Sequence, residues 1–215
     1  RGATPVAVSA FASLTRIGTS PDPDSWTIHN GAMGVFNAAA EYIDTDDIDE
    51  APQGTIARRS TGGWLGFTDH FWLGAVIPAQ NAAVDTSIRH GSGNLYQADF
   101  ATTERVLAPN ATRTDESRIF AGAKETRVLD GYADDAGVTL LDRATDWGWF
   151  IWFAKPIFYL LDWLFTHIGN FGVAIMALTL IIRLVMYPIA QKQFQSMAAM
   201  RIVQPKVKAL RSEEH

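Results

Sequence analysis

The most informative residue is an arginine inside the most hydrophobic stretch of the chain. Arg183 is the only charged residue between His167 and Lys192. An arginine at the centre of a membrane-spanning helix costs about 2.5–3.5 kcal/mol of insertion free energy, so it normally faces protein, water or a counter-charge. Thr179 and Tyr187 lie four residues to either side and share one slowly rotating helix face with Met176. The pattern predicts a site that binds or hydrates polar groups without covalent chemistry.

Snorkelling is the alternative explanation for this arginine. Arg183 precedes Gln191 by eight residues, or about 12 Å of helical rise. Its guanidinium could therefore extend to the headgroups of the nearer leaflet. Residue spacing alone does not decide between a hydrated groove and a snorkelling side chain. The accompanying polar side chains favour the groove.

Catalytic and metal chemistry find little support elsewhere in the sequence. His29, His70 and His90 are scattered, and no pair of them has a metal-ligand spacing. An acidic run extends from Glu41 to Glu50, but a calcium loop starting at Asp44 would need a ligand at position 48 and a glycine at position 49. We therefore predict a solvated acidic loop, no catalytic residue, no metal site and no cofactor.

The element that carries Arg183 is predicted to span a membrane. Residues 168–190 are long and apolar enough to cross a hydrocarbon core of about 30 Å. Residues 1–170 hold 12 Lys and Arg against 21 Asp and Glu, whereas residues 190–215 hold 5 against 2. Short segments rich in Lys and Arg stay in the cytoplasm. This asymmetry predicts a large domain outside and a basic tail inside.

Residues 147–167 are predicted to form an amphipathic helix in the membrane interface. Its polar positions make one narrow stripe on a surface rich in Trp and Phe. The stripe and the proline that we place in the first helical turn are Lys155, Pro156, Tyr159 and Asp162. A second spanning helix, turning back at Gly169 and Asn170, is the alternative, and the charge asymmetry argues against it.

Residues 1–146 have the pattern of an all-β domain. Short aromatic and β-branched runs, at 26–28, 64–67, 71–77 and 118–122, alternate with turn-forming clusters such as Gly62-Gly63, which is typical of a sandwich. A helix is conceivable over 123–142, interrupted by Gly131 and Gly137. The chain starts at Arg1 in an alternating stretch, so we expect a piece of a longer exported protein. It has no cysteine, so disulfides cannot stabilise it.

The tail, residues 191–215, is predicted to be a basic amphipathic helix. We expect Pro188 to end or kink the preceding span. The basic face consists of Lys192, Arg201, Lys206, Lys208 and Arg211. Adsorption to anionic lipid and docking to a protein both suit this face, and the sequence leaves the two open.

Several motifs together resemble the YidC family of membrane protein insertases in its Gram-negative form. They are Asp146-Trp147-Gly148-Trp149-Phe150, Ala154-Lys155-Pro156, Gly169-Asn170, Ile181-Ile182-Arg183, Met186-Tyr187-Pro188, Met200-Arg201 and Gln204-Pro205-Lys206. Upstream, Gly62-Gly63-Trp64, Trp72 and Ile77-Pro78 resemble the periplasmic domain of the same family.

The resemblance implies a mainly β periplasmic domain, a β-super-sandwich like galactose mutarotase, followed by an α-helical membrane segment in the bacterial inner membrane. It implies that Arg183 faces a hydrophilic groove, with Thr179, Met176 and Tyr187 as further groove residues, and that residues 191–215 begin a cytoplasmic hairpin. The implied partners are nascent membrane proteins, the bilayer, the Sec translocon and the ribosome, with no nucleic acid. Because such a groove needs several helices, we expect this piece alone to be inactive.

Two other function classes remain as alternatives. A mutarotase-like sandwich could bind or process sugars, which would require histidine and carboxylate groups that converge in one pocket. A single-span scaffold would need no arginine on a polar helix face, so Arg183 argues against it.

Overall fold

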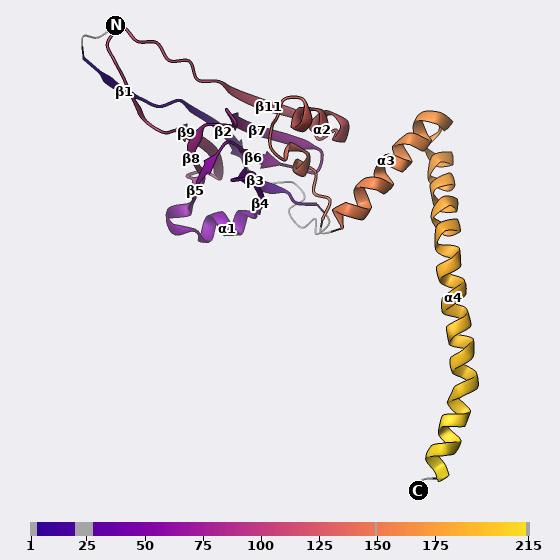
Figure 1. The fold of residues 1–215 in the computed structure, drawn as a ribbon. Helices are drawn as coiled ribbons and strands as arrows, with labels where there is room; N and C mark the ends of the chain where they lie inside the picture. Colours follow the sequence, from indigo (N-terminus) through magenta and orange to yellow (C-terminus); the bar gives the residue numbers. More distant parts are fainter. Residues whose placement is uncertain (1–3, 20–27, 149, 214–215) are drawn as a thin grey trace. The chain divides into compact units, whose positions relative to one another are not determined.

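The computed structural model describes residues 4–19, 28–148 and 150–213, with side chains described up to Gln193. It divides into two compact units, Arg1–Gly148 and Trp149–His215. The first is rich in β-strands and the second consists of helices (Figure 1). A mainly β domain followed by an apolar helix is therefore confirmed.

The strands of the first unit form three antiparallel sheets in the described residues. A two-stranded sheet pairs β1 (Val6–Val8) with β10 (Arg105–Leu107). A four-stranded sheet has the order β2 (Phe11–Ile17), β9 (Leu95–Thr102), β8 (Ala83–Gly91), β5 (Thr55–Thr61). A five-stranded sheet has the order β11 (Ser117–Ala123), β7 (Trp72–Pro78), β6 (Trp64–Thr68), β3 (Gly31–Phe36), β4 (Ala39–Ile43).

The centre of the five-stranded sheet is covered on both faces, so every residue of β3 and β6 is buried. Side chains alternate between the faces of a strand, so Ala32 and Phe36 enter one core cluster while Met33 and Val35 enter another. The first cluster fills the space against the four-stranded sheet. The strand runs predicted at 64–67, 71–77 and 118–122 are confirmed as β6, β7 and β11. The run at 26–28 lies mostly outside the described residues.

A short helical layer covers the outer face of the five-stranded sheet. It consists of α2 (Thr126–Asp134) and the 3₁₀ turn η2 (Leu141–Ala144), which bury Leu129 and Leu141 against β6 and β7. Trp64 is 1% exposed, and its Nε1 donates to the Thr139 carbonyl at 3.1 Å. Only part of the helix considered at 123–142 therefore forms.

The two glycines in that region behave differently, which corrects one expectation. Gly131 lies inside α2 and does not interrupt it. Gly137 has φ +64° and separates α2 from η2. Glycine adopts positive φ without steric cost, so Gly137 supplies the break.

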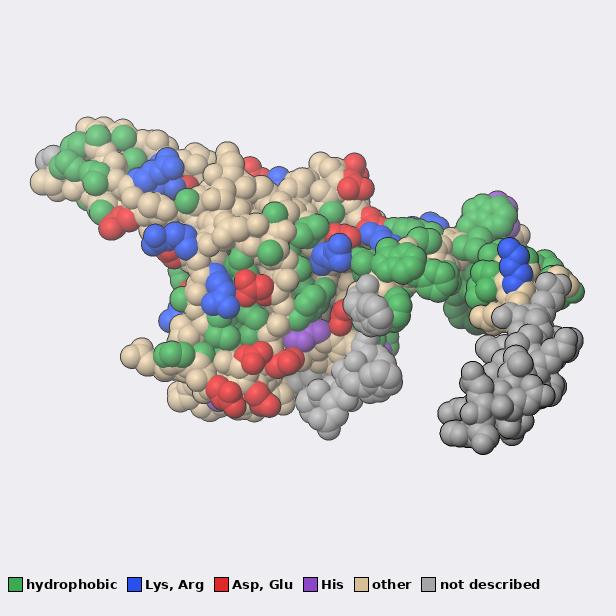
Figure 2. Space-filling view, turned by 60° about the horizontal axis from the view of Figure 1, so that its bottom comes forward, with side chains coloured by type: hydrophobic (Ala, Val, Ile, Leu, Met, Phe, Trp, Pro, Cys, Tyr) green, Lys and Arg blue, Asp and Glu red, His purple; other side chains and the backbone are tan. Residues whose placement is uncertain are grey.

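Residues 45–50 of the acidic run form a helix, so the prediction of a loop there was wrong, although the carboxylates are exposed as expected. After Asp44, helix α1 (Thr45–Glu50) begins, and the Asp44 amide donates to Asp47 Oδ2 at 3.2 Å. Ile48 is 1% exposed and packs in the core between the sheets. One buried apolar side chain and an N-terminal cap suffice for this turn-and-a-half helix. Its carboxylates gather at the surface of the β-rich unit (Figure 2).

The second unit begins with α3 (Ile151–Ile168), which starts later than the predicted residue 147. Gly148 has φ +61°, and its amide donates to Asp146 Oδ1 at 2.8 Å, so the backbone turns before the helix. Pro156 therefore lies in the helix interior rather than in the first turn, and the helix lacks one backbone bond there. Hydrophobic side chains dominate the part of this unit whose side chains are described (Figure 2).

The last helix, α4 (Phe171–Glu213), is continuous, so the expectation that it ends at Pro188 is wrong, while the alternative of a kink there stays a prediction. Proline removes one backbone donor, but its φ near −65° is itself helical, so the turns on either side of Pro188 are retained. By length and composition, Phe171–Gln193 is the one described segment able to span a membrane. The span and the basic segment therefore share one helix.

Candidate functional site

The α3–α4 corner sets which face of α4 is covered. Gly169 ends α3 with φ +71°, and its amide donates to the Phe165 carbonyl at 2.8 Å. Asn170 then caps α4, since its Oδ1 accepts from the Val173 amide at 3.2 Å. Ala174 is fully buried in this corner. The chain therefore turns at Gly169 and Asn170, as both the interfacial helix and the alternative second span require.

The covered face of α4 lies opposite the predicted groove face. Ala174 is buried and Ala177, Leu178 and Ile181 are half-buried on one side of α4, the helix that packs against α3. At about 100° per residue, their mean direction lies roughly 165° from that of the four groove candidates. Those four residues, Met176, Thr179, Arg183 and Tyr187, are all exposed in this chain. Helix α3 thus leaves the arginine face of α4 open.

Two hydrogen bonds along this face each use one donor or acceptor of a hydroxyl group and leave the rest of its capacity free. The Thr179 hydroxyl donates to the Ile175 carbonyl at 2.9 Å, and Gln191 Nε2 donates to the Tyr187 hydroxyl at 2.7 Å. Within the described part of the chain, the Arg183 guanidinium has no hydrogen-bond or ion-pair partner. Its donors are therefore available to water or to a ligand outside this chain.

Arg183 lies near the middle of the candidate span. It is 12 residues after Phe171 and 10 residues before Gln193, or about 18 Å and 15 Å along the helix. The choice between a hydrated groove and a snorkelling side chain at this depth stays a prediction.

The predicted interfacial residues are distributed along one side of α3. Lys155 and Asp162 are half-buried, whereas Pro156 and Tyr159 are exposed. Exposed aromatic rings flank this stripe, among them Trp152 at 72% and Trp163 at 55% exposure. An aromatic surface with a narrow polar stripe suits the headgroup region of a bilayer.

Most of the predicted basic face lies outside the described side chains. Lys192 is exposed near the end of the candidate span. The side chains of Arg201, Lys206, Lys208 and Arg211 are not among those described. The use of this face, on lipid or on protein, stays a prediction.

The histidines have structural partners in the β-rich unit. His29 Nδ1 lies 3.4 Å from Asp44 Oδ1, and His90 Nδ1 lies 2.7 Å from Asp49 Oδ1. His90 also stacks on Tyr96 with ring centroids 4.4 Å apart. In the part of the chain that the structure describes, no three His, Cys, Asp or Glu side chains are grouped to hold a metal ion.

A polar cluster on the four-stranded sheet was missed by the sequence reasoning. Asp99 is 6% exposed and accepts hydrogen bonds from Ser87 Oγ at 3.0 Å, from Gln97 Nε2 at 3.1 Å and from the Arg89 guanidinium. These residues come from β8 and β9, so only strand register brings them together. The network satisfies its buried carboxylate, which is what a structural role requires.

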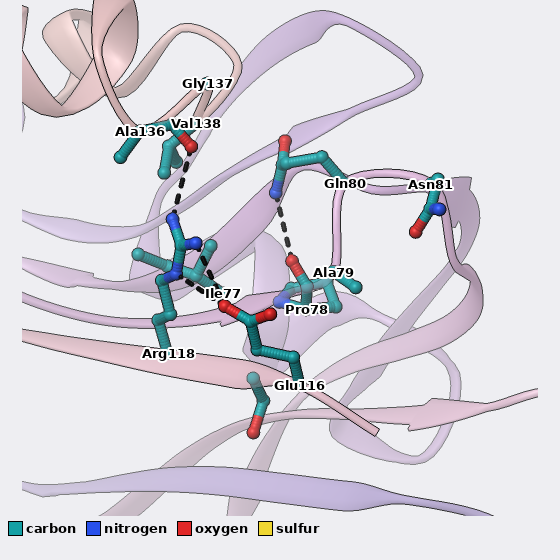
Figure 3. A pocket seen from close by; sticks show the side chains of 11 residues that line it. Ile77, Pro78, Ala79, Gln80, Asn81, Glu116, Arg118, Ala136, Gly137 and Val138 are labelled. Carbon is teal, nitrogen blue, oxygen red and sulfur yellow. Dashed lines mark hydrogen bonds and ion pairs between the residues drawn. The ribbon is translucent and has the colours of Figure 1, made fainter. Parts of the chain in front are cut away.

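A cavity of about 390 Å³ lies where β7 ends and β11 begins (Figure 3). Arg118 donates to Glu116 at 2.9 Å and to the Ala136 carbonyl at 3.2 Å. Gln80 Nε2 donates to the Pro78 carbonyl at 3.1 Å. The described lining thus contains one carboxylate, held by Arg118, and no histidine. It does not have the converging acid and base groups that sugar chemistry needs.

Two protein families match successive parts of the chain. The family described as YidC periplasmic domain matches residues 1–160, and the family described as 60Kd inner membrane protein matches residues 163–214. The chain belongs to the YidC family. The β-rich unit is of the YidC periplasmic type, and the segment with the candidate span is of an inner membrane protein type.

Curated relatives carry the name membrane protein insertase YidC. The relative from Zymomonas mobilis is 45% identical over 213 residues, which is 98% of this chain and 37% of that protein. The relative from Rhizobium etli is 36% identical over 99% of this chain and 36% of its own length. One from Beijerinckia indica is 36% identical over 96% of this chain and 35% of its own length. The chain spans little more than a third of these relatives.

Proposed function

We propose that this chain is part of a membrane protein insertase and chaperone that receives nascent membrane segments on the Arg183 face of α4. The observation that carries the proposal is the open arginine face. Four groove candidates on α4 are exposed, and they point away from the side that α3 covers. Its relatives are named as insertases, which supports the same function for the protein that contains this chain.

The chemistry of such a groove is electrostatic. A membrane segment with an acidic outer tail must move that tail across a low-dielectric core, which is costly for an unpaired charge. A guanidinium near mid-span attracts the tail while it is partway across and lowers this cost. At an effective dielectric constant of about 20, two unit charges about 8 Å apart attract by about 2 kcal/mol. Thr179 and Tyr187 would help to keep water beside Arg183.

The proposed orientation places the β-rich unit in the periplasm and the C-terminal part of α4 in the cytoplasm. The excess of Lys and Arg after residue 190 supports it. In this arrangement α3 lies in the outer interface, and the basic face of α4 is available to anionic lipid or to the ribosome. The periplasmic unit is the candidate partner of the Sec translocon. A sugar-processing role has less support, because the described cavity offers no acid and base pair.

Photo-crosslinking in the full-length protein tests the groove. The crosslinker is placed at Tyr187, with Val185 as the matched control. These positions are 61% and 65% exposed, differ by two residues in depth, and point about 160° apart around the helix. During synthesis of a short single-span substrate, Tyr187 should label the substrate and Val185 should not. Equal labelling of the substrate from both positions, or of lipid alone from both, would contradict the groove.

A further inference from the structure

Two large aromatic side chains are exposed at the tip of the β6–β7 hairpin. Phe71 is 67% exposed and Trp72 is 61% exposed, while the neighbouring residues of β6 are buried. The His70 ring lies edge-on to Phe71 with centroids 4.3 Å apart. The turn is closed by the Asp69 amide, which donates to the Trp72 carbonyl at 2.9 Å. The tip is therefore an ordered turn that presents two aromatic rings.

This tip lies close to the point where the chain leaves the β-rich unit. The Lys124 amide donates to the Phe71 carbonyl at 2.8 Å, and Lys124 Nζ donates to Thr68 Oγ1 at 2.8 Å. At the same end of the sheet, Gly31 of β3 pairs with Thr68, the last residue of β6. Asp146 Oδ2 in turn accepts from the His29 amide at 3.3 Å. These contacts join the hairpin tip to residue 146.

Chain connectivity keeps that exit point near α3. The β-rich unit ends at Gly148 and α3 begins at Ile151, three residues later. Three residues of extended chain reach at most about 10 Å. If α3 lies in the membrane interface, the exit point of the β-rich unit lies within about 10 Å of that interface.

We propose that the β6–β7 tip is a lipid-contact element, with Phe71 and Trp72 inserted among the headgroups of the outer leaflet. Aromatic rings favour this depth because one side of the layer is apolar and the other is wet. The charges at the tip do not oppose the contact, since Arg16 Nη2 pairs with Asp69 at 2.8 Å and Lys124 adds a cation. The proposal rests on the interfacial position of α3 in the proposed function. Its effect would be to hold the periplasmic unit in one orientation to the membrane.

Depth-dependent quenching in the full-length protein tests the proposal. A single cysteine carrying an environment-sensitive fluorophore replaces Phe71 (Phe71→Cys), in a protein without other cysteines; this chain contributes none. Trp152→Cys on α3 is the interface control, and Val106→Cys on β10 is the aqueous control. These two positions are 72% and 74% exposed. Each protein is placed in liposomes that contain lipids spin-labelled at the headgroup, and iodide is used separately as an aqueous quencher.

The label at position 71 should lose as much fluorescence to the spin-labelled lipid as the label at 152, and the label at 106 should lose none. Lipid quenching at 152 but not at 71 would overturn the proposal and leave the proposed function intact. Protection of position 71 from both quenchers would also overturn it, because a protein surface would then cover the tip. Absence of lipid quenching at 152 would remove the interfacial α3 and so overturn the lipid contact, whereas the Arg183 face of α4 is judged separately by the crosslinks at Tyr187 and Val185.

Discussion

Replacing Gly63 by alanine should destabilise the β-rich unit far more than the same change at another glycine of similar conformation. Gly63 has φ +82°, and an added Cβ would lie 1.9 Å from the carbonyl oxygen of Val35. Ordinary contacts of this kind are 3.4 Å or longer, so the buried strand β3 would have to move away from the turn before β6. Gly93, in the β8–β9 turn, has φ +76° and no atom within 4 Å of such a Cβ.

The two sites separate the cost of conformation from the cost of overlap. A non-glycine residue in the left-handed region loses roughly 1–2 kcal/mol, and Gly93→Ala should lose that amount. Overpacking a core adds about 1–3 kcal/mol, so Gly63→Ala should lose roughly 2–5 kcal/mol. Domains are stable by only about 5–15 kcal/mol in total, so the change at Gly63 would remove a large part.

Urea unfolding followed by far-ultraviolet circular dichroism measures both changes in the free energy of unfolding. The midpoint for Gly63→Ala should fall well below that for Gly93→Ala, with the same dependence on urea concentration. Equal losses at the two positions would show that the Val35 carbonyl is not a rigid obstacle. The assignment of the Gly62-Gly63 turn as a packed contact would then be wrong.

Three further predictions concern the helical unit and one buried amine. Exchanging Arg183 and Val185 keeps the composition of the span but turns the charge toward the α3 side. If the transition state of insertion loses about 2 kcal/mol of electrostatic attraction, substrates with acidic tails should insert roughly thirtyfold more slowly. An unchanged insertion rate in a proteoliposome assay would contradict the groove. Ala174→Leu should push α3 and α4 apart, because this position is fully buried. Distances between one spin label on α3 and one on α4 should lengthen in this variant, whereas Ala174→Ser should preserve them. Burial lowers the pKa of Lys124, and the opposing effects of Asp146 and Asp69 are smaller. Between this lowered pKa and the unfolded-state value of about 10.4, the unfolded chain binds more protons than the folded one. The free energy of unfolding of the wild type, relative to that of Lys124→Met, should therefore rise with pH in this range. A difference that stays constant between pH 7 and 10 would refute this reasoning.

Local sequence pattern was sufficient for strands β6, β7 and β11 and for the candidate span. Runs such as 64–67 and 71–77 are short, aromatic and bounded by turn residues, so period and composition alone predict β6 and β7. The span was predictable because hydropathy and length decide it directly. Helix ends were not predictable to the residue: Pro188 has a helical φ and α4 passes through it, while the contact of Gly148 with Asp146 delays α3.

Only the tertiary structure shows which elements and side chains are in contact. The sequence put Arg183 on a polar helix face, but only the packed corner at Ala174 shows that α3 takes the opposite face. Pattern likewise failed for α1, because its stability depends on burying Ile48 between two sheets that no local signal relates. The Asp99 network depends on strand register, and the place of Phe71 beside the chain exit depends on contacts with Lys124. Periodicity determines which face of an element is apolar, whereas the partner of that face is set by contacts between residues distant in sequence.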